Sequence, residues 1–105
     1  MSLSKANLYP EPDQRLCNSF KGLGHPTRKS ILKTLCSGGE LTVQELTALH
    51  PLTIGAVSQH LEIMYDAKFI KSRKCSPFIF YDVDAEPLKE FCDCCFQFLM
   101  EIQRK

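Results

Sequence analysis

The chain has no long apolar run, no visible secretory signal and no internal repeat that would set it apart from ordinary globular proteins. No apolar stretch approaches the roughly 18–20 residues of a membrane-spanning helix, and no basic segment followed by an apolar one opens the chain, as in a secretory signal. We therefore expect a cytoplasmic protein without a membrane partner. The length of 105 residues and the hydrophobic content of 44% predict one globular domain.

Acidic residues are missing from two segments that are rich in basic ones. Residues 15–39 hold five Lys or Arg residues and residues 68–74 hold four, with no acid in either segment. Residues 82–101 instead carry six acids and one Lys. This separation, hidden in a net charge of +1, suits a protein with one face for a polyanion and a second face elsewhere. The alternative is ordinary charge scatter on a solvated surface.

The chain also lacks the motifs of common enzyme sites. It has no glycine-rich phosphate loop. The histidines at positions 25, 50 and 60 fall in a different segment from the C-terminal cysteines, so no Cys–His nucleophile is indicated. We expect no enzymatic activity.

The local patterns that are present predict a mainly α chain. We expect an irregular arm over residues 1–12 and a domain over residues 13–105. The first helix of that domain covers about residues 13–21, with Leu16, Cys17 and Phe20 on one side, and ends at the glycines 22 and 24. A second helix starts at Pro26, because proline is favoured at the first helical position.

Capping residues predict the next two helices. Thr42 and Glu45 form a capping box, which starts a short third helix. Thr53 caps a fourth helix after a tight turn. Two helices joined by such a turn are typical of a helix-turn-helix.

A hairpin and a long helix are expected in the C-terminal third. Residues 69–74 and 78–83 are rich in strand-forming side chains and flank a short loop. A last helix begins near Asp84 and carries apolar residues at helical spacing as far as Ile102. The apolar stripe is broad for the end of a small domain, so we interpret it as a subunit contact.

The fourth helix carries the most informative surface. Val57, Leu61 and Met64 form an apolar stripe, while small or uncharged residues face the other way. A helix exposed only for solubility usually carries Lys and Glu on that side. Small residues allow close approach to a surface, and Ser and Gln can read base edges in a major groove.

These residues and their spacing resemble the ArsR/SmtB family of winged-helix repressors. The matching segments are residues 20–28, 31–32, 39–41 and 57–61, together with Tyr81. The resemblance implies a winged helix-turn-helix with four helices, a β-hairpin and a fifth helix. It also implies a homodimer through the first and last helices, and binding to double-stranded operator DNA that a small effector releases.

The chain departs from the family pattern at the metal sites. Many metal sensors of the family place two cysteines where this chain has Thr42 and Gln44, and a second family site uses histidine from the last helix, which has none here. Neither metal site carries over, so we expect no resident cofactor. The turn after the fourth helix usually has Gly where this chain has Lys68.

The resemblance and the residues together predict a DNA-binding surface. We expect the helix over residues 53–66 in the major groove and the hairpin over residues 69–83 as a wing that contacts phosphates. We read His60 as a packed histidine rather than a base reader. An alternative is a winged helix that binds protein and not DNA. The predicted DNA contacts are Thr53, Ile54, Gly55, Ala56, Ser58, Gln59, Lys71, Arg73 and Lys74.

Three of the six cysteines form a candidate thiol sensor. Cys92 and Cys95 lie three residues apart on one face of the last helix, and Cys17 lies on the helix that packs near it in the family dimer. Together they could bind a soft metal ion or be oxidised as an effector signal. The other reading is that they pack as small hydrophobic side chains.

Overall fold

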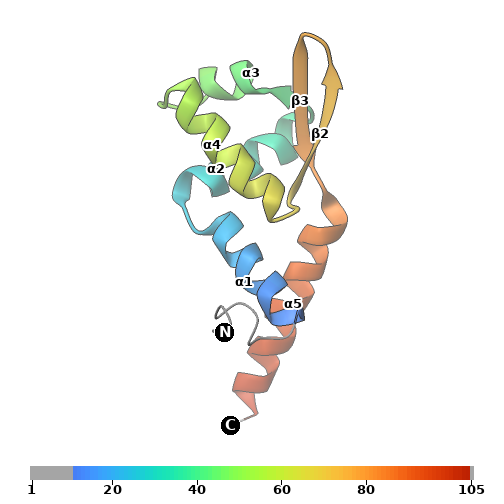
Figure 1. Cartoon of the computed structure of the whole chain (residues 1–105). Coiled ribbons are helices and arrows are strands. Elements are labelled where there is room, and N and C mark those ends of the chain that lie inside the picture. The colour runs from blue at the N-terminus through green and yellow to red at the C-terminus, as the bar shows by residue number, and fades with distance from the viewer. Residues whose placement is uncertain (1–10, 105) are drawn as a thin grey trace, which may run out of the picture.

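Helices make up most of the molecule, and a small sheet forms one end of it (Figure 1). The computed structural model describes residues 11–104. The mainly α winged helix-turn-helix is confirmed, with one strand more than predicted. The elements are α1 (Glu11–Leu23), α2 (Pro26–Gly38), β1 (Leu41–Thr42), α3 (Val43–Ala48), α4 (Ile54–Asp66), β2 (Ile70–Cys75), β3 (Phe78–Val83) and α5 (Ala85–Gln103).

Capping side chains start the central helices where the sequence predicts. The Thr42 hydroxyl accepts a hydrogen bond from the Glu45 amide at 3.1 Å, and the Glu45 carboxylate accepts one from the Thr42 amide at 3.0 Å. The Thr53 hydroxyl accepts a hydrogen bond from the Ala56 amide at 3.2 Å, which caps α4. These bonds satisfy amides that a helix start otherwise leaves unpaired.

The first helix differs from its prediction at both ends. It begins at Glu11, two residues before the expected start, and continues through Gly22 to Leu23. Gly22 therefore does not end the helix. A Cβ atom at this position would lie 2.5 Å from Cβ of Ala67, so glycine is needed there for α1 to pack against the end of α4. Most of the predicted arm (residues 1–10) and the side chain of Leu16 lie outside the described part of the chain.

The core lies between α2, α3, α4 and the base of the hairpin. The predicted stripe of α4 is confirmed, since Val57, Leu61 and Met64 are all buried. Helices α2 and α3 contribute apolar side chains to the same cluster, and Ile70 joins it from β2. The fully buried large side chains are Phe69, Ile31, Leu35, Leu46, Leu61, Met64 and Val57.

The sheet is antiparallel, with strand order β1-β3-β2. The unpredicted strand β1 pairs Leu41 with Tyr81 and thereby ties the hairpin to the start of α3. In β2 the side chains alternate between the two faces of the hairpin, so Arg73 and Lys74 point to opposite sides. The hairpin projects away from the helices (Figure 1). Lys68 lies in the turn before the hairpin, at the position where the family has Gly. Its φ is +66°, the left-handed conformation that glycine favours.

The last helix is packed poorly within one chain. None of its residues is buried, and its C-terminal half extends past the other helices (Figure 1). The first half lies against α1 and the core, where the Phe91 ring contacts Phe20 and Phe69 with centroid distances of 5.1 and 5.4 Å. Its large exposed apolar side chains are Phe96, Phe98, Leu99, Met100 and Ile102.

Candidate nucleic-acid interface

The predicted front of the fourth helix is open to solvent. Thr53, Gly55, Ser58 and Gln59 are exposed, while Ala56 is half-buried. A Cβ atom at Gly55 would meet no other atom within 4 Å, so the start of this face is flat and unobstructed. A polar, uncharged helix face of this kind can approach the edges of base pairs closely.

Ile54 stands at the edge of the same face. The sequence left open whether this side chain packs in the protein or contacts DNA. It is 49% exposed at the first position of α4. An exposed isoleucine at this place can make an apolar contact with the methyl group of a thymine.

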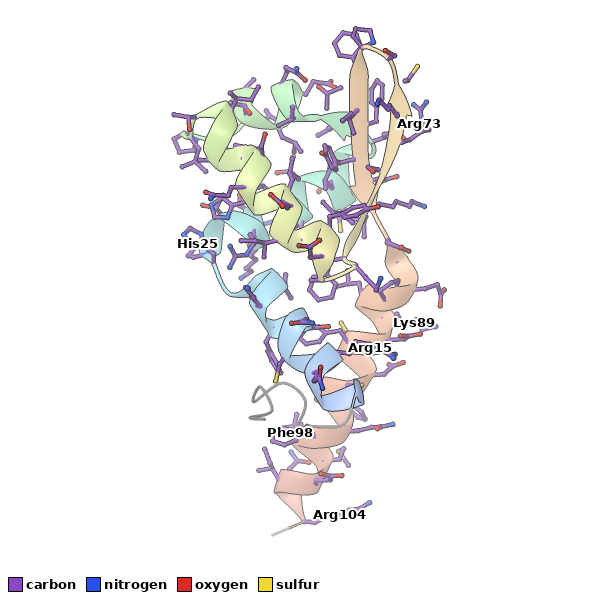
Figure 2. All side chains as sticks on the ribbon, viewed as in Figure 1. Arg15, His25, Arg73, Lys89, Phe98 and Arg104 are labelled. Atoms are coloured by element: carbon purple, nitrogen blue, oxygen red, sulfur yellow. The ribbon has the colours of Figure 1, made fainter. Side chains whose placement is uncertain are left out.

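The cations predicted for the wing are exposed, but one of them is already paired. Arg73 donates hydrogen bonds to the Glu40 carboxylate at 2.6 and 3.1 Å, and its guanidinium lies 4.9 Å from the centroid of the Phe80 ring. The Arg73 guanidinium lowers the pKa of Glu40, and the carboxylate raises the pKa of Arg73. Lys71 and Lys74 have no such ion pair among the described residues. Figure 2 shows Arg73 on the projecting hairpin.

Sequence reasoning missed the role of Glu40. This residue lies in the short connection between α2 and β1, and 33 positions separate it from Arg73. No local pattern marks the pair, because the fold brings the two residues together through the β1–β3 pairing. Glu40 therefore neutralises a charge that the sequence assigned to the DNA face.

The first basic segment is likewise not all surface charge. Arg28 is buried in the first turn of α2, and its Nη1 atom donates a hydrogen bond to Nδ1 of His60 at 3.1 Å. The His60 ring also lies 4.6 Å from the His25 ring, centroid to centroid. His60 is thus a packed histidine, as predicted. Burial, then the nearby His25 and Arg28, lower its pKa below 6.5.

The six cysteines are unpaired, and none of them is buried within the chain. Cys17 and Cys92 are exposed and Cys95 is half-buried, so packing inside the single chain does not account for them. No group of three metal-binding side chains occurs in residues 11–104. A three-thiolate site from Cys17, Cys92 and Cys95 is therefore not formed by one chain.

Comparison with known proteins agrees with this geometry. Residues 25–72 match the family described as "Bacterial regulatory protein, arsR family". The transcriptional repressor SdpR of Bacillus subtilis is 30% identical over 73 residues, which cover 70% of this chain and 80% of that protein. The arsenical resistance operon repressor of the same organism is 28% identical over 109 residues, covering 90% and 100% of the two chains.

A solved structure shows the same fold. The homodimeric winged helix-turn-helix DNA-binding domain from Mycobacterium bovis superposes with a TM-score of 0.71 at 14% identity, covering 99% of this chain and 94% of that one. The family match and the named relatives, together with this fold, define a DNA-binding transcriptional regulator of the winged-helix class. Within this class, the chain belongs to the ArsR family.

Proposed function

We propose that the protein is a homodimeric repressor that inserts α4 of each subunit into the major groove of its operator. The observation that carries this proposal is the exposed, uncharged front of α4, which is free of Lys and Glu side chains from Thr53 to Gln59. Gln59 can pair with adenine through two hydrogen bonds, and Ser58 can bond to either base of a pair. Thr53, exposed at the N-cap of α4, can contact a phosphate there.

The wing supplies the sequence-independent contacts. Lys71 and Lys74 are exposed on opposite faces of the hairpin, and each can bind a phosphate, the kind of contact that contributes most of the salt-dependent affinity. Arg73 joins them only by exchanging the Glu40 carboxylate for a phosphate. A guanidinium binds both groups with the same two-pronged geometry, so Glu40 competes with DNA for Arg73.

The dimer follows from the exposed apolar side chains of α5. Several large exposed apolar side chains on one helix mark an interaction site, and a second copy of the same helix is its simplest complement. Pairing α1 and α5 about a two-fold axis would present two copies of α4 to successive major grooves. A regulator with this design acts on chromosomal DNA, so we place it in the cytoplasm.

Selection of DNA from a random duplex library tests the proposal. The variable region should cover about two helical turns, the span of two half-sites. We expect enrichment of a pseudo-palindromic sequence, and a steep loss of affinity for it between about 50 and 200 mM salt. If the protein retains no duplex at about 50 mM salt, the alternative of a protein-binding winged helix is correct.

The cysteines remain a candidate effector site within this function. Cys17 and Cys92 are exposed and Cys95 is half-buried in the single chain, and all three lie on the two helices of the proposed dimer contact. Oxidation or a soft metal ion bound by thiolates from two subunits would change that contact. If the Cys92→Ser, Cys95→Ser double variant is released from DNA by the same reagents as the wild type, the α5 cysteines are not the sensor.

A further inference from the structure

Among the described residues, one basic side chain, that of Arg28, is buried, and it lies beside α4. The side chain of Arg28 is only 8% exposed, and its Nε atom has no hydrogen-bond partner. No carboxylate among the side chains that the structure describes forms an ion pair with it. A buried guanidinium without a carboxylate partner lowers the stability of the fold. The contacts that Arg28 does make therefore indicate its role.

The hydrogen bond from Arg28 determines which nitrogen of the His60 ring carries the proton. The distance from Nη1 of Arg28 to Nδ1 of His60 is 3.1 Å. A guanidinium can only donate, so Nδ1 of His60 must be the acceptor and carries no proton. His60 is therefore neutral in this arrangement, with its proton on Nε2.

We propose that Arg28 is a positioning residue for DNA binding: it holds α4 in its binding orientation through neutral His60, and protonation of His60 releases that hold. The inference rests on the proposed DNA-binding function. A proton on Nδ1 removes the acceptor of the hydrogen bond and places a second cation beside the guanidinium. Acidification therefore weakens DNA binding through this contact.

The place of His60 on α4 makes the contact effective. His60 is half-buried and follows Gln59, between the exposed front and the buried stripe that contains Leu61. The bond ties this flank of α4 to the first turn of α2, 32 residues earlier in the chain. Loss of the bond leaves this flank of α4 without its link to α2, so Ser58 and Gln59 are positioned less firmly relative to the groove.

The surroundings of His60 define when the proton binds. The charged or titratable groups that act on it are His25 and Arg28, both from the start of α2, and none acts from α1, α3 or β2 within the described chain. Burial and these two groups lower the pKa of His60 below 6.5. The hydrogen bond is thus intact at neutral pH and is lost only as the pH falls below the ordinary histidine range.

The direction in which acid changes DNA affinity distinguishes this inference from direct binding of a DNA phosphate by His60. If His60 bound a DNA phosphate directly, acid would protonate it and strengthen binding. The wing ion pair cannot imitate the expected loss, because Arg73 holds the pKa of Glu40 below 4.5. Glu40 therefore stays ionised over the pH range of the experiment.

The experiment compares the wild type with two histidine variants on one labelled duplex, the sequence enriched from the random library at about pH 7.5. In His60→Asn the amide oxygen can accept the Arg28 hydrogen bond at every pH. His50→Asn is the matched control, since His50 is also half-buried but bonds to Leu46 and Ser30 instead. Affinity is measured at about pH 7.5 and about pH 5.5, on either side of the ordinary histidine pKa.

We expect the wild type and His50→Asn to lose up to about tenfold in affinity per subunit on acidification, since one protonation changes binding by at most tenfold per pH unit and the pKa of His60 lies below 6.5. His60→Asn should bind at the higher pH and lose less than about twofold. Stronger binding in acid, or an equal acid loss in His60→Asn, overturns the inference while leaving DNA binding established. Failure to enrich any duplex instead refutes the proposed function.

A measurement without DNA keeps the inference testable in that case. Nitrogen NMR of the wild-type imidazoles should show the His60 proton on Nε2 at neutral pH, and a titration below 6.5 that also shifts the backbone amides of α4. A proton on Nδ1 at neutral pH, or a titration that leaves the α4 amides unchanged, overturns it.

Discussion

At the scale of the residue, Glu40 determines how much charge the wing offers to DNA. In the free protein its carboxylate holds Arg73 through two hydrogen bonds. The Glu40→Gln substitution removes the ion pair and frees the guanidinium for a phosphate. We expect tighter binding to the selected duplex, and a salt dependence steeper by about 0.9 in log–log slope for each phosphate gained per subunit.

The control for this prediction removes one acid without freeing an arginine. Glu90 is exposed on α5, away from the wing, so Glu90→Gln changes the net charge equally. Fluorescence anisotropy titrations at several salt concentrations compare the three proteins. A Glu40→Gln protein that binds more weakly than Glu90→Gln would mean that Glu40 supports the wing and does not compete with DNA.

Replacing either of two glycines by alanine should affect the stability of the fold differently, because their surroundings differ. A Cβ at Gly22 would clash with Ala67 at 2.5 Å, so Gly22→Ala should destabilise the fold by about 1–3 kcal/mol, as overpacking does. A Cβ at Gly55 meets nothing, so Gly55→Ala should leave stability unchanged or raise it by up to about 1 kcal/mol. Urea denaturation measures both. A stable Gly22→Ala protein would show that α1 does not need its close approach to α4.

The Gly55→Ala variant also tests the close approach of α4 to DNA. The added methyl group stands on the proposed contact face and should lower affinity for the selected duplex without lowering stability. Undiminished affinity in gel retardation would place Gly55 outside the contact. Because the stability of this variant is retained, a loss of binding cannot be attributed to unfolding.

At the scale of the element, the sequence predicts what short-range chemistry determines. The capping box of Thr42 and Glu45 and the cap at Thr53 set helix starts within a few residues, so α3 and α4 were predicted correctly. Strand β1 was missed because its two residues become a strand only by pairing with β3. The predicted start of α1 lies two residues too late, and the sequence wrongly predicts a helix break at Gly22 because the contact of Gly22 with Ala67 is not local.

The candidate site follows the same division. The exposed front of α4 could be predicted because helical periodicity separates it from the buried stripe. The two pairs that govern its charge and orientation could not, since Arg73–Glu40 and Arg28–His60 join residues more than thirty positions apart. Neither pair has a sequence motif of its own, and each depends on how β1 or α2 packs in the folded chain.

At the scale of the whole molecule, the two functional ends are separated. The hairpin and α4 present the basic and uncharged surfaces, while the acidic, apolar α5 extends from the opposite end (Figure 1). Figure 2 shows Phe98 on that projecting part, far from Arg73. A change at Phe98 can therefore affect DNA binding only through the association of two chains.

This separation gives a prediction for Phe98, whose side chain is 62% exposed. Phe98→Glu adds a charge to the apolar surface of α5 and should convert a dimer into a monomer. DNA affinity should then fall by at least about a hundredfold, because a second half-site bound through the same dimer adds a factor of about 10² to 10⁴. Phe78→Glu, at an aromatic residue 48% exposed on the wing, is the matched control and should leave the dimer intact. Sedimentation velocity measures the association state of both variants. A Phe98→Glu protein that remains dimeric, or a wild type that sediments as a monomer while binding the selected duplex tightly, would show that this surface of α5 does not join two subunits.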